Sequence, residues 1–299
     1  MISYEDALVA RHRVAGAARH TPLEYPFALS DMTRPDAHLK LEHLQRTGAF
    51  KIRGAINRIA TLPDEAKEAG VVTASAGNHA QGVALAATRA GVDSKIVMPE
   101  HAPVSKVKAT ERYGGEAILH GQDYSDAQTE AHRIERAEGR TYVHAFDDEM
   151  VMAGQGTIGL EIVEDCPEVE TVIVPIGGGG LISGIATAVK ASDPDVRVIG
   201  VQAEGASGAA ESRRKGEIYE RESVETIADG IATRRIGDRT FEVIRDRVDE
   251  VVTVDDESIA IALTYLLERE KALAEGAGAI SLAALLSGAI EYEEGEVIV

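Results

Sequence analysis

The chain has 299 residues, of which 44% are hydrophobic and 4% aromatic, and its formal net charge at pH 7 is -19. So acidic a chain, with no tryptophan and few rings for base stacking, is a poor match for a phosphate backbone, which argues against nucleic-acid binding. No stretch is apolar for long enough to span a bilayer, and the first residues lack the basic and apolar regions of a signal peptide. With a single cysteine, Cys166, these features lead us to expect a cytoplasmic protein without disulfides.

The acidity has two readings. Fifty Asp and Glu against 31 Lys and Arg suit a surface that stays hydrated at high salt, where screening removes charge repulsion. The other reading is an ordinary acidic protein, and the sequence leaves both open.

The first part of the chain predicts two helices and a short strand. A helix is expected at residues 3–18, where Ser3 is placed to cap it and Asp6 to complete a capping box. Residues 37–42 alternate like a strand, and a helical pattern returns at residues 50–62.

From residue 70 the chain alternates between buried-type strands and helices. Strands are expected at residues 70–74, 94–99, 116–120, 171–175, 196–201 and 250–254. Helices are expected at residues 78–91, 104–113, 125–139, 155–163, 180–191 and 256–274. The short connections allow only right-handed crossovers, so the pattern predicts an α/β fold with two open, mostly parallel sheets covered by helices. The first sheet is expected at about residues 55–147.

Lys51 is a candidate reactive group at the start of the helix expected at residues 50–62. Phe50 and Ile52 flank it with apolar side chains, and Gly48 lies close by. A lysine among apolar neighbours loses hydration, which favours the free amine that attacks carbonyl groups. A solvated surface lysine is the alternative at this one position.

Four consecutive glycines, Gly177, Gly178, Gly179 and Gly180, join an expected strand to an expected helix. Backbone N–H groups of such a turn, with a helix N-terminus behind them, can hold a phosphate or a carboxylate. No Walker A lysine and no spaced glycine motif with an acidic ribose contact accompanies the turn, which argues against a nucleotide. A tight turn without a ligand is the alternative.

A second strand-to-helix loop, residues 73–82, contains Ser75, Ala76, Gly77, Asn78 and His79. Its exposed amides are expected to hold a second anion such as a substrate carboxylate, and Asn78 to offer its amide to a ring oxygen. Ser75 as a helix cap is the structural alternative, and His79 receives no catalytic role.

A reactive lysine, a non-nucleotide phosphate site and a carboxylate-binding loop together point to pyridoxal 5'-phosphate. The chain resembles the fold-type II (tryptophan synthase β-like) pyridoxal enzymes, and within them the threonine/serine dehydratase branch. The resemblance is carried, in this order along the chain, by residues 47–55, 75–82, 175–181, 228–238 and 274–279.

The resemblance implies a role for each matching position. Lys51 would bond to the cofactor aldehyde, Phe50 would pack beside the ring, and Asn78 would bind the ring oxygen. Gly177 to Gly180 and Leu181 would hold the phosphate, and Gly230 and Glu275 would close the pocket. Ser75, Ala76, Gly77, Asn78 and His79 would line the substrate site. Residues 1–54 with 148–299 would form a large cofactor-binding domain, and residues 55–147 a small domain that closes over the substrate.

The implied reaction is β-elimination from L-threonine to 2-oxobutanoate and ammonia, with L-serine giving pyruvate more slowly and Lys51 acting as the base. Racemase relatives carry a serine at the position of Ala76, and an alanine cannot exchange a proton, so elimination is favoured. A serine racemase, a threonine synthase-like β-replacement enzyme and a non-catalytic amino-acid-binding homologue are the alternatives.

Three departures from the family pattern concern Ala49, the C-terminus and the metal site. Ala49 replaces a serine that supports the phosphate, and the chain stops at Val299, before the serine motif that faces the pyridine nitrogen. Either the sequence is shortened or that contact is missing. The cation site of some relatives pairs an acid at Glu204 with another at the position of Ala210, so no metal is expected.

The resemblance also bears on regulation and assembly. The relatives are dimers or tetramers, so a homodimer or homotetramer is expected, with an amino acid as the small-molecule partner. Feedback-controlled relatives carry a further C-terminal domain, for which this sequence has no room. If the chain is complete, we therefore expect no inhibition by isoleucine, and the resemblance implies an enzyme of isoleucine biosynthesis.

Overall fold

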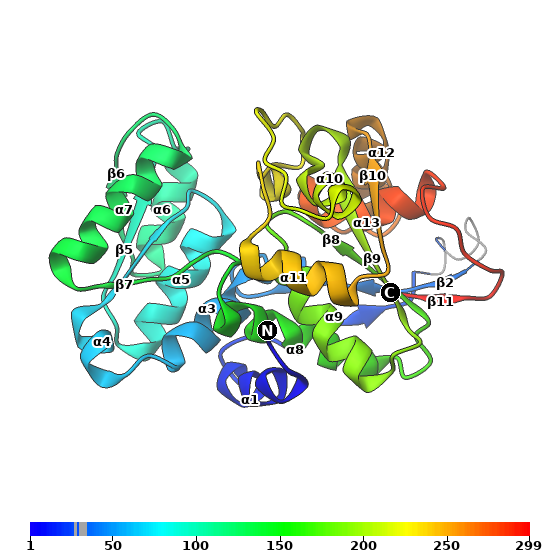
Figure 1. Ribbon diagram of the computed structural model, residues 1–299, viewed down its shortest axis with the longest axis horizontal. Helices are drawn as coiled ribbons and strands as arrows, with labels where there is room; N and C mark the ends of the chain where they lie inside the picture. The colour runs from blue at the N-terminus through cyan, green and yellow to red at the C-terminus, as the bar shows by residue number, and fades with distance from the viewer. Residues whose placement is uncertain (27–28, 30–34) are drawn as a thin grey trace.

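The computed structural model describes residues 1–26, 29 and 35–299. Two groups of parallel strands lie side by side in Figure 1, each covered by helices, and central helices run between them. This is the α/β architecture with two mostly parallel sheets that the alternating pattern predicts.

The first sheet has four strands in the order β6-β5-β4-β7, all parallel. The strands are β4 (Val71–Ala74), β5 (Ser94–Met98), β6 (Glu116–Leu119) and β7 (Thr141–Tyr142). Its crossover helices are α5 (Asn78–Ala90), α6 (Val104–Arg112) and α7 (Tyr124–Glu138). β4 is buried at every position, as expected for a central strand covered on both faces.

The second sheet has five parallel strands in the order β10-β9-β8-β11-β2. The strands are β2 (Asp36–Ala37), β8 (Thr171–Pro175), β9 (Arg197–Ala203), β10 (Glu250–Val254) and β11 (Val297–Ile298). Helix α9 (Gly180–Ser192) crosses from β8 to β9. A separate antiparallel pair joins β1 (Leu23–Glu24) to β3 (Leu39–Lys40).

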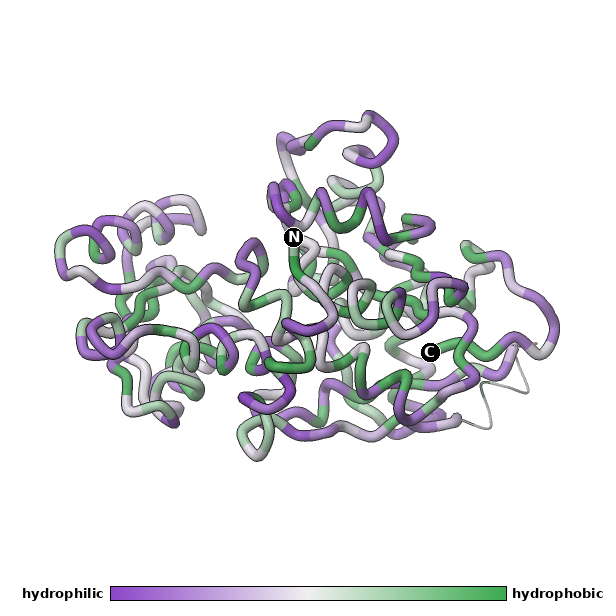
Figure 2. Tube along the Cα trace, turned by 60° about the horizontal axis from the view of Figure 1, so that its bottom comes forward, coloured by the Kyte–Doolittle hydropathy of each residue, from purple (hydrophilic) through white to green (hydrophobic). Residues whose placement is uncertain are grey.

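Three helices near the junction pack on one another: α1 (Tyr4–Val14), α3 (Lys51–Ala60) and α8 (Glu149–Asp165). Helix α8 also packs along α9, so it connects the first sheet's unit to the second. Ser3 and Asp6 form the predicted capping box of α1. In Figure 2 the apolar segments lie mainly inside and the polar ones outside, in agreement with separate buried cores around the two sheets.

The remaining elements surround the second sheet, apart from α4 (Asp64–Ala69), which precedes β4. They are η1 (Glu42–Leu44), η2 (Glu204–Ala206), α10 (Gly208–Lys215), η3 (Asp229–Ile231), α11 (Asp238–Arg247), α12 (Asp256–Glu268) and α13 (Gly276–Leu286).

Three predicted helices have the wrong bounds. Helix α1 ends at Val14 rather than at residue 18. Helix α8 begins at Glu149 rather than at residue 155, because the Asp148 carboxylate accepts the N–H of Val151 and caps it six residues earlier. Helix α12 ends at Glu268 rather than at residue 274, since the backbone turns at Lys271 with φ +55°. Helices α4, α10, α11 and α13 are absent from the sequence prediction.

Candidate active site

Lys51 is the first residue of α3, and its amine lies in a partly buried, weakly hydrated position. Its Nζ donates a hydrogen bond to the carbonyl oxygen of Ala145 at 3.0 Å and lies 5.1 Å from the centre of the Phe50 ring. Burial lowers the pKa of Lys51 to about 8, against an opposing effect of Glu275. Among the described residues no carboxylate lies within ion-pair distance of this amine. The site therefore makes the neutral, nucleophilic form of the amine more available than it is in a solvated lysine.

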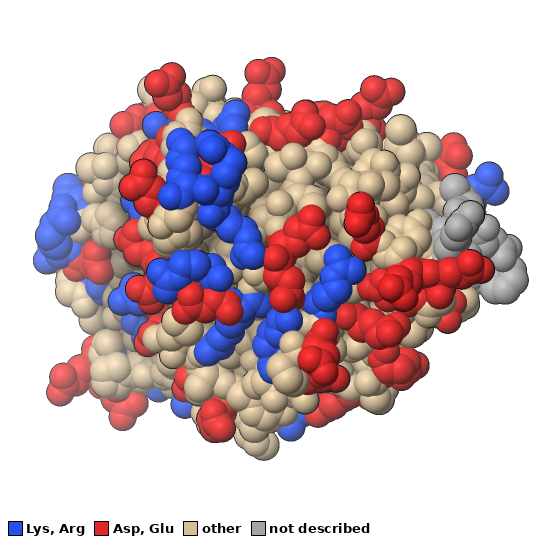
Figure 3. All heavy atoms as spheres, turned by 45° about the vertical axis from the view of Figure 1, so that its right-hand side comes forward, with Lys and Arg blue, Asp and Glu red and all other residues tan. Residues whose placement is uncertain are grey.

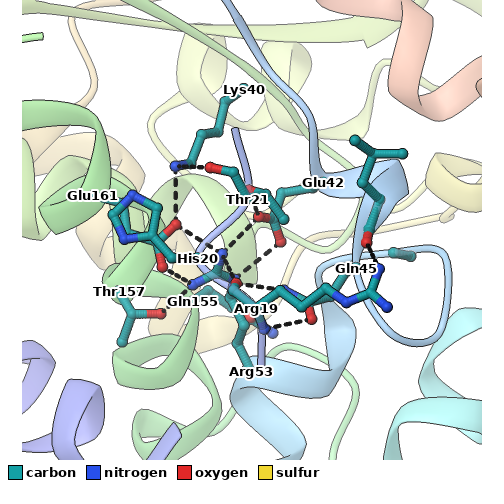
Figure 4. Close-up of polar contacts among 12 residues, drawn as sticks. Arg19, His20, Thr21, Lys40, Glu42, Gln45, Arg53, Gln155, Thr157 and Glu161 are labelled. Atoms are coloured by element: carbon teal, nitrogen blue, oxygen red, sulfur yellow. Dashed lines mark hydrogen bonds and ion pairs between the residues drawn. The ribbon is translucent and has the colours of Figure 1, made fainter. Parts of the chain in front are cut away.

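Directly beyond Lys51, a buried ion-pair network fixes α3 (Figure 4). The Arg53 guanidinium is fully buried and donates to Glu42 Oε1 at 2.7 Å and to Glu161 Oε2 at 2.9 Å. It also donates to Thr157 Oγ1 and to the carbonyl oxygen of Arg19. These partners come from η1, α8 and the segment before β1, so the network holds the helix that carries Lys51 against three parts of the chain.

The loop from Ser75 to His79 precedes α5, close to Lys51. A Cβ at Gly82 would lie 3.2 Å from the backbone of Lys51 and Ile52, which requires glycine there. Ser75 does not cap α5: its Oγ accepts the N–H of Gly77, and Gly77 is the N-cap residue. The Cβ position of Gly77 faces open space, and the helix N-terminus behind it leaves its first amides without intrahelical partners.

His79 is buried and neutral. Its Nε2 lies 2.9 Å from the carbonyl oxygen of Val143 and donates to it, which leaves Nδ1 as an acceptor without a partner. Burial, assisted by the charge of Lys51, lowers the pKa of His79 to about 3. A proton-transfer role near neutral pH is therefore excluded for this side chain.

Asn78, Gly230 and Glu275 meet across the two units. Asn78 Nδ2 donates to Glu275 Oε1 at 2.7 Å. A Cβ at Gly230 would lie 3.2 Å from Glu275 Oε1, and one at Gly177 would lie 3.1 Å from the Cα of Ile231. Desolvation and the charge of Asp229 raise the pKa of Glu275. The structure thus brings these predicted residues together near Lys51, and the charge of Glu275 partly opposes the lowering of the Lys51 pKa.

The glycine turn connects β8 to α9 as predicted, and close packing explains why some of its positions are glycine. Gly179 has φ +95°, and a Cβ at Gly178 or Gly180 would overlap Phe146. The Gly178 carbonyl oxygen accepts the Thr240 hydroxyl at 2.7 Å, which holds the turn from behind. Leu181 packs against the core of the second sheet, so only its backbone is available to a ligand.

These residues fit pyridoxal phosphate. The glycines of the turn have no side chains of their own to cover its amides, the N-terminus of the 13-residue α9 adds a positive dipole end, and a lysine with a lowered pKa lies in the same region. Sequence reasoning missed Ala145, Phe146 and Asp147, which follow β7 and contact Lys51, the turn and α11. The sequence signal that could have identified them is the pair Phe146-Asp147, directly before Asp148, the N-cap residue of α8.

The part of the chain that the structure describes offers no metal centre. No group of three or more His, Cys, Asp or Glu side chains is arranged to hold a metal ion there, and Glu204 lies in the short η2 turn. None of the helices described in residues 1–26, 29 and 35–299 combines the length and apolarity needed to cross a membrane.

Comparisons with known proteins agree with this geometry. The family model described as pyridoxal-phosphate dependent enzyme matches residues 14–299. An L-threonine ammonia-lyase of Thermotoga maritima is 50% identical over 287 residues, which are 96% of this chain and 72% of the relative.

Two solved structures are similar over nearly the whole chain. Maize serine racemase has a TM-score of 0.96 at 38% identity, and the match covers 99% of this chain and 92% of the racemase. The processed form of threonine deaminase isoform 2 from Solanum lycopersicum has a TM-score of 0.94 at 36% identity, with 99% of this chain and 87% of the deaminase covered. The fold is therefore shared by enzymes named as deaminases and as racemases, and the side chains must decide between them.

Proposed function

This chain belongs to the family of pyridoxal-phosphate dependent enzymes, and on that premise we propose that it is an L-threonine ammonia-lyase. It converts L-threonine to 2-oxobutanoate and ammonia, and L-serine to pyruvate more slowly. The observation that carries the proposal is the Lys51 amine, held by the Ala145 carbonyl with a pKa lowered to about 8.

The cofactor supplies an electron sink for negative charge at the substrate Cα. Lys51 would hold it through its amine, with Phe50 beside that amine. Asn78 would offer its amide to the ring oxygen, Glu275 and Gly230 would close the pocket, and the amides of residues 177–181 would bind the phosphate.

Lys51 also takes the α-proton. A pKa of about 8 leaves about a tenth of the amine neutral at pH 7, far more than in a solvated lysine, and the neutral form is the one that acts as a general base. Residues Ser75 to His79 (Ser75, Ala76, Gly77, Asn78 and His79) would line the substrate-carboxylate site at the α5 N-terminus. The Ser75 and Gly77 N–H groups already donate to the Val97 carbonyl oxygen and to Ser75 Oγ, so the first amides of α5 would bind the carboxylate. His79 stays neutral there and so adds no positive charge beside Lys51.

Serine racemisation is the second candidate, because of the likeness to the maize enzyme. Ala76 argues against it: a methyl group cannot return a proton to the opposite face of Cα. We assay the PLP-loaded protein with L-threonine and L-serine, measuring oxo acid and both enantiomers of the remaining amino acid. Oxo acid without D-enantiomer supports the proposal, and D-serine as the main product contradicts it.

Ala76→Ser provides a matched comparison. It adds one hydroxyl, and we expect it to release a measurable D-enantiomer while elimination continues. If the variant and the wild-type protein give identical products, Ala76 does not set the reaction outcome.

Residues 55–147 are proposed to move as a small domain over the rest of the chain. Asn78 with Glu275 and Lys106 with Asp229, whose Nζ and Oδ2 lie 3.2 Å apart, join the two units across the site. We also propose a homodimer or homotetramer, to be measured by light scattering.

Adaptation to high salt is proposed from the surface. Figure 3 shows Asp and Glu side chains scattered over much of one face, among uncharged atoms and with Lys and Arg gathered toward its left, and the net charge of the chain is -19. Added KCl should raise the melting temperature through screening of this repulsion. A melting temperature that stays constant or falls with KCl contradicts this adaptation.

A further inference from the structure

The segment His144–Asp147, here called the linker turn, lies between β7 and α8. It carries the chain out of the first sheet's unit and touches both halves of the proposed cofactor site. None of its residues belongs to the motifs that identify the family in the sequence analysis.

At one end, the linker turn holds the reactive amine. The Ala145 carbonyl oxygen accepts the Lys51 hydrogen bond at 3.0 Å. The orientation of this peptide is fixed because His144 Nδ1 accepts the N–H groups of Phe146 at 3.2 Å and of Asp147 at 2.8 Å. The Phe146 ring stands edge-on to the His144 ring, with centres 4.6 Å apart.

At the other end, the linker turn caps a helix far away in sequence. The Asp147 carboxylate accepts the N–H groups of Asp238 at 3.2 Å, Arg239 at 2.9 Å and Thr240 at 3.2 Å, which form the first turn of α11. A Cβ at Gly237 would overlap the Asp147 side chain, so the close approach requires glycine. Three charge-assisted hydrogen bonds to one carboxylate make this a strong attachment.

The same turn of α11 holds the glycine turn. Thr240 Oγ1 donates to the Gly178 carbonyl oxygen at 2.7 Å, and the N–H of Gly237 donates to it at 3.2 Å. Phe146 fills the space beside Gly178 and Gly180. A continuous set of contacts therefore leads from the Lys51 amine through the linker turn and α11 to the backbone of the glycine turn.

We propose that the linker turn positions the Lys51 amine relative to the glycine turn. Asp147 is the positioning residue, because its contacts with α11 connect the linker turn to the glycine turn, where the cofactor phosphate is proposed to bind. The inference rests on the proposed function, which assigns Lys51 and the glycine turn to the two ends of one cofactor. Asp147 touches neither group directly. It acts through α11 and Gly178, so its loss weakens cofactor binding more than it weakens the fold.

The neighbouring Asp148 is a matched control. It also caps a helix, through the Val151 N–H at 3.0 Å, and it pairs with Arg58 at 2.9 Å. Among the described contacts, however, Asp148 makes none with α11 or with the glycine turn. Asp147→Ala and Asp148→Ala therefore each remove one capping carboxylate, and only the first removes the link to the phosphate end.

The test measures the dissociation constant of pyridoxal phosphate by titrating the cofactor-free full chain, alongside the melting temperature and amide hydrogen exchange. We expect Asp147→Ala to raise this constant at least about tenfold and to speed exchange at residues 178–180 and 238–240. Asp148→Ala should leave the constant within about twofold, with a comparable fall in melting temperature. Asp147→Asn, which keeps one acceptor oxygen, should lie between the wild-type protein and Asp147→Ala.

Equal dissociation constants for the two alanine variants overturn the proposal, as does an unchanged constant in Asp147→Ala. If Asp147→Ala does not fold, the comparison of Asp147→Asn with Asp148→Asn decides by the same criterion. A wild-type protein that does not bind pyridoxal phosphate refutes the proposed function instead, so the two failures are distinct.

Discussion

Two basic residues lie two positions apart in the first turn of α3, and their surroundings give them opposite chemistry. Burial disfavours the charge of both, but Arg53 contacts Glu42 and Glu161, which raise its pKa despite that cost. Lys51 contacts the neutral Ala145 carbonyl, and burial lowers its pKa to about 8. The comparison shows that contact with carboxylates, rather than burial alone, decides which cation is structural and which is reactive.

Arg53 and Lys51 also differ in how firmly their side chains are held. The Arg53 network attaches α3 to α8 and to the segment around Arg19, whereas Lys51 makes no ion pair with the described residues and donates to the Ala145 carbonyl oxygen. A rigid helix thus presents a weakly attached amine, as a group that must exchange partners during turnover requires.

The largest expected effect is that of Lys51→Ala. Removal of the amine should lower the rate of 2-oxobutanoate formation from threonine by at least about 10³-fold, because the base and the cofactor attachment are lost together. Lys108→Ala, an exposed lysine on α6, is the matched control and should keep full activity. Substantial activity in the Lys51 variant would assign the chemistry to another group.

Arg53→Met should disrupt the buried ion-pair network that holds α3. Glu42 and Glu161 would lose the cation that they share, leaving Glu161 with Lys40 and Glu42 with the Thr21 hydroxyl, and we expect a loss of about 3–5 kcal/mol in the free energy of unfolding. Urea denaturation measures it. Arg245→Met, which removes the surface pair with Asp246, should leave the denaturation midpoint unchanged. Equal shifts in the two variants would show that the buried network is not a stabilising core of the site.

The lowered pKa of Lys51 makes a prediction for the cofactor-free protein. Below pH 8 the amine is charged in both states, and its burial destabilises the fold by about 1–3 kcal/mol relative to Lys51→Met. Between pH 8 and 10.5 the folded state has lost the proton and the unfolded state still binds it, so wild-type stability rises toward that of the variant. A stability difference that stays constant from pH 7 to pH 10 contradicts a pKa near 8.

The smallest effect is expected at the ion pair of Lys106 and Asp229, which joins α6 to η3. Because both side chains are solvent-exposed, the pair contributes only about 0–1 kcal/mol. Lys106→Gln should raise the KM for threonine about two- to threefold at low salt, and 1 M KCl should abolish the difference from wild type. Lys106→Arg keeps the charge and should behave as wild type; a salt-independent KM change in Lys106→Gln would rule out an electrostatic contact.

The sequence alone predicts Lys51 as a candidate reactive residue, but it does not predict the ion-pair network of Arg53. Lys51 and the glycine turn belong to local motifs at the ends of periodic segments, so neighbouring residues identify them. The partners of Arg53 lie 11 residues before it, at Glu42, and 108 residues after it, at Glu161, and no local pattern links them.

The same reason explains the other omissions. Asp147 caps α11 across 91 to 93 residues, and such a capping contact leaves no signal near Gly237 except the glycine itself. Helix α12 ends without a glycine or proline, at the positive φ of Lys271, so periodicity extends it too far.

The most direct test is to fix the cofactor in place with borohydride in the loaded wild-type protein and to map the modified peptide by mass spectrometry. The account predicts one pyridoxyl group, carried by Lys51. A label on another lysine, or an unmodified Lys51 in a protein that retains the cofactor, would contradict it.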